Sequence, residues 1–179
     1  MLGDGRTVPF LLHAISDGDK IVQREAEAAM KKLGSSALTS LVQILRDGKP
    51  PYRAEAARRL GALRDVRAVR YLIPSLVEDD CGMQAADALL RIGRASVEEL
   101  LRYLSDDPNL ENVTPALKEH VTRVLGKIRD PRAIDPMLGI LSDTAQPARL
   151  RAEAARVLGL LGSRKACLLY TSDAADDLY

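Results

Sequence analysis

The sequence has few of the residue types that build metal centres, disulfide frameworks or aromatic pockets. Its 179 residues include two Cys, two His, one Phe, five Tyr and no Trp. His13 and His120 are far apart in sequence and neither has a partner cysteine, which argues against a zinc site. Apart from Cys167, whose segment is treated below, Cys81 is the single thiol. We therefore expect no disulfide framework, and a reducing, cytoplasmic location.

The chain also lacks long apolar runs, a strong charge of one sign and the common catalytic motifs. No run of 18 apolar residues and no basic-then-apolar leader occurs, so the sequence predicts no membrane segment in this piece of chain. The formal net charge is +1, and it is +4 without residues 167–179, which contain three Asp and no Lys or Arg; both values are too small to indicate nucleic acid as a partner. Without a nucleophile elbow, phosphate-binding loop or dinucleotide fingerprint, we predict no enzyme, no catalytic residue, no metal and no cofactor.

What the sequence does contain is one pattern that returns about every thirty residues. A leucine or isoleucine followed by glycine or arginine closes one helix-like stretch and precedes another. These pairs are Leu2-Gly3, Leu33-Gly34, Leu63-Arg64, Ile92-Gly93, Ile128-Arg129 and Leu161-Gly162. A fixed period of this length indicates stacked units, because a single unit cannot bury its apolar face alone.

The half of each unit that follows the pair carries apolar residues at positions i, i+3, i+4 and i+7. Five such stripes begin at Val8, Leu38, Val69, Val97 and Ile134. This spacing is typical of an amphipathic helix rather than a strand. Pro74 interrupts the third stripe, so we expect that helix to kink or break there.

The half of each unit that precedes the pair is rich in alanine. One row of mostly small residues holds Ala26, Ala56, Ala85, Val121 and Ala154, and the row four residues on holds Met30, Leu60, Leu89, Leu125 and Leu158. Small side chains allow neighbouring helices to approach closely, and the larger ones fill the space between them. Asp65 and Asp130 follow their pairs as expected N-caps, with Pro131 in a first helical turn. The sequence therefore predicts an all-α solenoid of antiparallel helix pairs.

Residues 53–69, which read RAEAARRLGALRDVRAV, resemble the HEAT-like repeats of phycobilisome lyases, and residues 150–159 repeat the opening of that segment. The resemblance covers nearly all of residues 2–166. It implies a right-handed, armadillo-like superhelix of about five repeats, truncated at both ends, in which the second helices line the concave face. The pattern departs at residues 93–97, which lack the Asp-x-Arg element, and at an insertion over residues 105–115.

Residues 167–179 break the repeat pattern. Their sequence, CLLYTSDAADDLY, resembles the translation of a sequencing-library adapter, so we predict a non-native tail that follows a solenoid over residues 1–166. On this interpretation the chain is a fragment of a longer protein. We then expect exposed apolar surface at both ends and self-association, because solenoids need polar terminal caps.

The remaining functional hypothesis is a non-enzymatic scaffold that binds a protein or peptide along the concave face. Its candidate contact residues are Arg70, Tyr71, Arg102, Tyr103, His13 and Gln43. Tyrosine and arginine are enriched at interface anchors. Two alternatives rest on resemblance: a bilin lyase-like accessory factor and a nucleic-acid-binding HEAT-like protein. Glu119-His120 is similar to a His-Glu pair of deoxyhypusine hydroxylase, but its order is reversed and it occurs once, so we predict no iron site.

Overall fold

The computed structural model describes residues 5–16, 18–105 and 107–162, and every regular element within them is helical. This confirms the predicted all-α solenoid of helix pairs. The predicted non-native tail, residues 167–179, lies outside the described residues. The chain divides into two compact units, Met1–Gly93 and Arg94–Tyr179, which are considered separately below.

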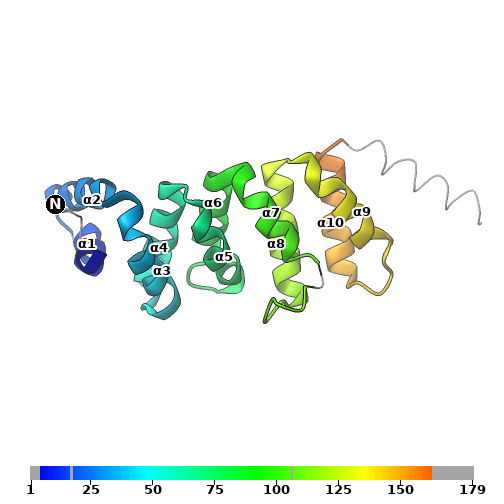
Figure 1. The fold of residues 1–179 in the computed structure, drawn as a ribbon, viewed down its shortest axis with the longest axis horizontal. Coiled ribbons are helices and arrows are strands. Elements are labelled where there is room, and N and C mark those ends of the chain that lie inside the picture. The colour runs from blue at the N-terminus through cyan, green and yellow to red at the C-terminus, as the bar shows by residue number, and fades with distance from the viewer. Residues whose placement is uncertain (1–4, 17, 106, 163–179) are drawn as a thin grey trace, which may run out of the picture. The chain divides into compact units, whose positions relative to one another are not determined.

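The first unit contains α1 to α6, coloured blue to green in Figure 1. Its α-helices are α1 (Val8–Ile15), α2 (Lys20–Leu33), α3 (Leu38–Asp47), α4 (Pro50–Leu63), α5 (Val69–Leu72) and α6 (Gly82–Ile92). Short 3-10 turns lie between them: η1 (Gly5–Thr7), η2 (Gly34–Ala37), η3 (Val66–Ala68) and η4 (Pro74–Val77). Helix α5 ends at Leu72 and a 3-10 turn begins at Pro74, which confirms the predicted break.

The second unit contains α7 to α10. Its elements are α7 (Val97–Arg102), α8 (Pro115–Ile128), η6 (Pro131–Ala133), α9 (Ile134–Ser142) and α10 (Ala148–Leu160), and the 3-10 turn η5 (Gly93–Ser96) leads into α7. Within this unit α10 packs against both α8 and α9. The helices α1, α3, α5, α7 and α9 correspond to the predicted second helices, and α2, α4, α6, α8 and α10 to the first helices.

A residue with a positive φ recurs at the boundary between the two helices of each pair. In the five pairs of the repeat pattern that the structure describes, the residue after the leucine or isoleucine has a positive φ: Gly34 52°, Arg64 51°, Gly93 69°, Arg129 57° and Gly162 62°. Arg64 and Arg129 are in the left-handed helical conformation, which ends a helix just past its last turn. Gly34 and Gly93 instead have ψ of −134° and −136°, a combination that glycine adopts without steric cost. The pattern seen in the sequence is therefore the mark of a repeated helix end.

The two Asp-x-Arg elements that lie wholly within the described residues cap the turns that follow. The carboxylate of Asp65 accepts a hydrogen bond from the backbone N–H of Arg67 at 2.9 Å, and that of Asp130 accepts one from Arg132 at 3.0 Å. The same two arginine side chains also donate to these carboxylates. This confirms the predicted capping role and explains why aspartate occupies this position.

The predicted small-residue row lies in the core. Ala56, Ala85, Val121 and Ala154 have no exposed surface, and Ala26 is buried as well. Leu60, Leu89, Leu125 and Leu158, from the larger row, are also buried. Helices α4 and α6 pack against each other in the first unit through these residues, and so do α8 and α10 in the second.

Candidate partner-binding site

Two adjoining hollows lie between α1 and α3 at the start of the first unit, each with a volume of about 430 to 450 Å³. Together they form what we call the α1–α3 groove, which is lined by Arg6, Pro9, Phe10, Leu12, His13, Ser40, Gln43, Ile44, Asp47, Gly48 and Tyr52. Pro9, Ile44 and Gly48 line both hollows, so the two are continuous. Cavities of this size are typical of small-molecule or side-chain binding sites.

The helical periodicity explains why these residues face outwards. Val8 and Leu12 of α1 are fully buried, and Leu41 and Leu45 of α3 have 0 % and 1 % exposure. When those residues point into the core, the intervening positions on each helix face solvent or the neighbouring helix. Pro9 is tolerated because it lies in the first turn of α1, where its missing N–H costs no hydrogen bond.

Phe10 is the most exposed large side chain of the groove. It is the only phenylalanine of the chain, and 77 % of its surface is accessible. An exposed aromatic ring beside an apolar hollow resembles the anchors that carry most of the energy in protein interfaces. Phe10 and the half-buried Ile44 thus form the apolar part of the groove.

The hollow that Phe10 lines also contains a polar contact. Nδ1 of His13 on α1 lies 2.9 Å from the hydroxyl of Tyr52 on α4, and the two ring centroids are 6.3 Å apart. This hydrogen bond holds both rings in place before any partner arrives. Such preorganisation lowers the entropy lost on binding.

Of the six residues predicted from the sequence, His13 and Gln43 lie in the groove. Arg70 and Tyr71 lie on α5, where the guanidinium carbon of Arg70 is 4.9 Å from the centre of the Tyr71 ring. This cation–π contact occupies one face of that ring. Arg70 is exposed and Tyr71 is half-buried, so both remain candidates for a separate contact surface.

The remaining two residues belong to the second unit, and one of them was placed wrongly. Only 7 % of Tyr103 is exposed, because α7 ends at Arg102 and the tyrosine packs beside the buried Leu104. Burial, with the nearby Glu99 charge, raises the pKa of Tyr103. Arg102 is exposed but forms ion pairs with Asp107 at 2.9 Å and with Glu99 at 3.5 Å. Tyr103 is therefore left out of the proposed contact residues.

Sequence reasoning missed Phe10, Ile44 and Tyr52. Phe10 falls outside the apolar stripe that begins at Val8, and a large apolar residue outside a stripe is a signal of an exposed anchor. Tyr52 belongs to α4 and meets His13 only through the packing of α1 against α4. No sequence spacing reveals that contact.

Cys81 and His120 are the side chains considered from the sequence as a thiol and as a metal ligand, and burial shifts the pKa of both. Cys81 is fully buried, and burial raises the pKa of its thiol to about 11, so it is not a thiolate at neutral pH. Burial, together with the Arg123 charge, lowers the pKa of His120. Among the described residues, no three His, Cys, Asp or Glu side chains gather as a metal site, and no helix is both long and apolar enough to cross a membrane.

The sequence profile of HEAT repeats matches residues 8–89, which include the α1–α3 groove. This part of the chain is therefore similar to HEAT repeats. The solved structure of human deoxyhypusine hydroxylase in complex with glycerol is 19 % identical, covering 96 % of this chain and 79 % of that one. Its TM-score of 0.33 is too low to support an argument. No curated protein matches this sequence significantly.

Proposed function

We propose that this chain is a non-enzymatic scaffold that binds a protein or peptide partner, with the α1–α3 groove as its anchor site. The observation that carries the proposal is the exposed ring of Phe10 beside an apolar hollow that also holds the hydrogen-bonded His13 and Tyr52. Both α1 and α3 are second helices of their pairs, the helices expected to line the concave face. The similarity of residues 8–89 to HEAT repeats supports the same class of function.

The chemistry of the groove defines the partner that would fit. Phe10, Ile44 and Pro9 favour an apolar side chain, whereas Gln43 and the His13–Tyr52 pair offer hydrogen bonds to a peptide backbone or a polar side chain. Burying an aromatic ring of about 150–250 Å² is worth roughly 4–6 kcal/mol at about 25 cal/mol per Å² before ordering costs. Because 1.4 kcal/mol is about tenfold in affinity, loss of this ring should be measurable.

A displayed-peptide selection on the immobilised full chain tests this proposal. Peptides that are selected by the natural chain should bind Phe10→Ser at least about tenfold more weakly in fluorescence polarisation. Met83→Ser is the matched control, because Met83 lies on α6 of the same unit, is 82 % exposed and is outside the groove. Equal loss in both variants, or undiminished binding to Phe10→Ser, would contradict the assignment.

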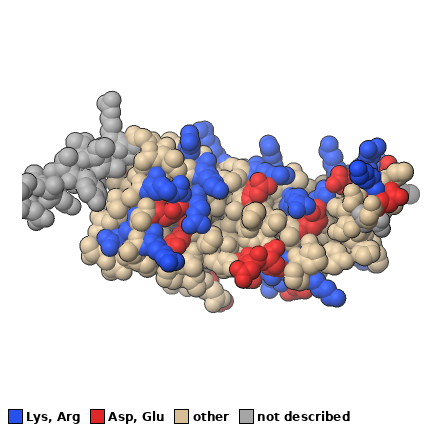
Figure 2. Space-filling model, turned by 180° about the vertical axis from the view of Figure 1, so that it is seen from behind, with Lys and Arg blue, Asp and Glu red and all other residues tan. Residues whose placement is uncertain are grey.

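The two alternatives have separate readouts. A change in visible absorbance on mixing with a bilin would support the lyase-like factor. DNA binding that falls steeply with salt would support the nucleic-acid protein. Over the described residues, the face shown in Figure 2 carries basic and acidic side chains interspersed, whereas a nucleic-acid footprint is a basic stripe.

A further inference from the structure

At two interfaces between neighbouring first helices, a glycine allows the helices to approach each other closely. A Cβ added to Gly61 of α4 would lie 2.5 Å from the Cα of Ala88 in α6. A Cβ added to Gly126 of α8 would lie 2.6 Å from a methyl carbon of Val157 in α10. Both glycines stand five residues after the small-residue row of their own helix, and both partners stand three residues after that row in the next first helix. The contact is therefore the same in the two units.

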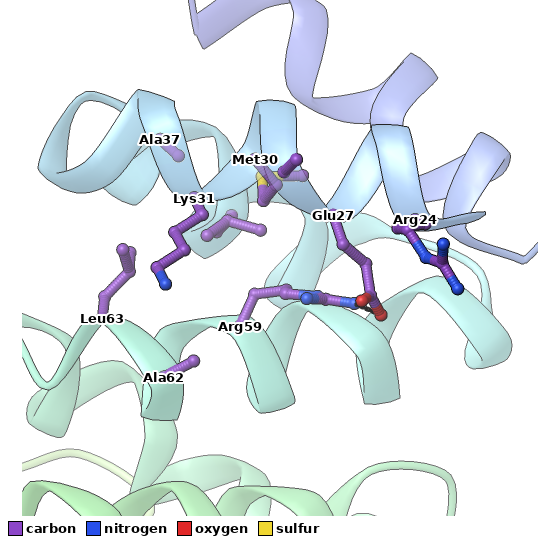
Figure 3. Close-up of a pocket in the computed structure, with 10 residues that line it drawn as sticks. Arg24, Glu27, Met30, Lys31, Ala37, Arg59, Ala62 and Leu63 are labelled. Atoms are coloured by element: carbon purple, nitrogen blue, oxygen red, sulfur yellow. Dashed lines mark hydrogen bonds and ion pairs between the residues drawn. The ribbon is translucent and has the colours of Figure 1, made fainter. Parts of the chain in front are cut away.

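The interface between α2 and α4 has long cations at these two positions. Counting from Ala26 and Ala56, the glycine position is Lys31 and the partner position is Arg59. Two long side chains of like charge cannot meet as glycine and alanine do. A cavity of about 390 Å³ lies here instead, between the two helices (Figure 3).

The cavity combines an apolar floor with an excess of positive charge. Met30, Ala37 and Leu41 form the floor, and each is at most 4 % exposed. Its ionisable lining residues are Arg24, Lys31, Arg59 and Glu27. In Figure 3, Lys31 extends from α2 towards Ala62 and Leu63 of α4.

The single acid of the lining is already engaged. Arg59 donates to Glu27 at 3.1 Å and to Glu55 at 2.6 Å, and its side chain is only 19 % exposed. Within the described part of the chain, neither Arg24 nor Lys31 forms an ion pair. Two positive charges therefore remain unbalanced at the rim of an apolar cavity.

We infer that the α2–α4 cavity binds a small organic monoanion with an apolar body, such as a medium-chain carboxylate. The hydrocarbon part lies against Met30 and Leu41, and the carboxylate accepts hydrogen bonds from the ammonium of Lys31, with Arg24 adding positive potential. The size of the cavity falls within the range of small-molecule sites. Charge complementarity selects the anion, and the apolar floor selects against strongly hydrated anions such as inorganic phosphate.

Titration calorimetry with octanoate, octanol and inorganic phosphate on the full chain tests this inference. Octanoate should bind more tightly than octanol, because only octanoate carries the charge, and phosphate should bind more weakly still. In the double variant Arg24→Gln and Lys31→Gln, octanoate affinity should fall about tenfold, the order expected when charged hydrogen bonds are lost. Lys32→Gln is the matched control, since Lys32 is exposed on the same helix and does not line the cavity.

Amide NMR shifts locate the ligand and separate this inference from the proposed function. Octanoate should perturb amides of α2 and α4, and Ala62→Phe, which fills the cavity, should abolish binding while the circular dichroism spectrum is kept. Phe10→Ser should leave octanoate binding unchanged. The inference is overturned by equal binding of octanol, by equal affinity of the double variant and Lys32→Gln, or by absence of octanoate binding at millimolar concentration.

Discussion

Replacing Gly126 by alanine tests how closely α8 and α10 approach each other. The added Cβ would lie 2.6 Å from Cγ2 of Val157 and 3.4 Å from its Cβ and Cγ1. Ordinary carbon contacts are about 3.5–4.0 Å, so the closest pair is too near by about 1 Å. Val157 is fully buried and β-branched, which leaves it little freedom to rotate away inside a helix. The two helices must then separate.

The magnitude follows from two opposing effects. Alanine in a helix interior is favoured over glycine by about 0.5–1 kcal/mol, and overpacking costs about 1–3 kcal/mol. Gly139→Ala isolates the first effect, because Gly139 lies within α9 of the same unit with no atom within 4 Å of an added Cβ. We expect Gly139→Ala to stabilise the chain and Gly126→Ala to be about 1–3 kcal/mol less stable than that control.

Urea unfolding followed by circular dichroism measures both free energies of unfolding, provided that the m-value stays constant. Adding Val157→Ala to Gly126→Ala removes the methyl group that the new Cβ meets. The double-mutant cycle should therefore show a favourable coupling of about 1 kcal/mol or more. If Gly126→Ala stabilises the chain as much as Gly139→Ala, or if the coupling is zero, the close approach of α8 and α10 is refuted.

Two further predictions concern ionisable groups. Asp130→Ala should lower the free energy of unfolding by about 0.5–2 kcal/mol, since it removes the N-cap of η6. The hydrogen bonds from Arg132 lower the pKa of Asp130 to about 2, so this stabilisation is complete above the ordinary carboxyl pKa of 3.8 and is lost as pH falls towards 2. Urea titrations of both proteins between pH 2 and 7 check this, and a pH-independent difference would contradict it. Burial raises the pKa of Cys81 from 9.0 to about 11, so a thiol reagent at pH 8 should label it only as fast as the chain opens, and stability should fall as pH rises from 9 to 11. With the other thiol removed by Cys167→Ser, labelling of the folded chain at the rate of a free thiol would refute this.

The helix pairs could be predicted because the features that define them are local. Each apolar stripe, each Asp cap and the interruption at Pro74 act within a few residues of one helix, so the sequence displays them directly. The repeat pattern also located every positive-φ boundary from Gly34 to Gly162. Helix periodicity and capping chemistry are sufficient for this level of the fold.

The candidate site could be predicted only in part, because it depends on contacts between helices. His13 and Gln43 were identified from the outward row, whereas Tyr52 joins the groove from α4. Tyr103 was misplaced because the stripe beginning at Val97 suggests a longer helix than the structure has, and α7 ends at Arg102. Predicting the cavity beside Lys31 requires comparing one position across several repeats and knowing which residue of the neighbouring helix faces that position.

The recurring residue of positive φ also divides the chain into equivalent segments. The segment from Gly34 to Gly93, for example, contains two second helices, each followed by a first helix. It begins and ends in nearly the same backbone geometry, with φ 52° and ψ −134° at Gly34 and φ 69° and ψ −136° at Gly93. Deleting or duplicating such a segment joins one helix end to an equivalent one, so no helix is left incomplete. At these boundaries the number of repeats can therefore change by recombination while the existing turn is kept.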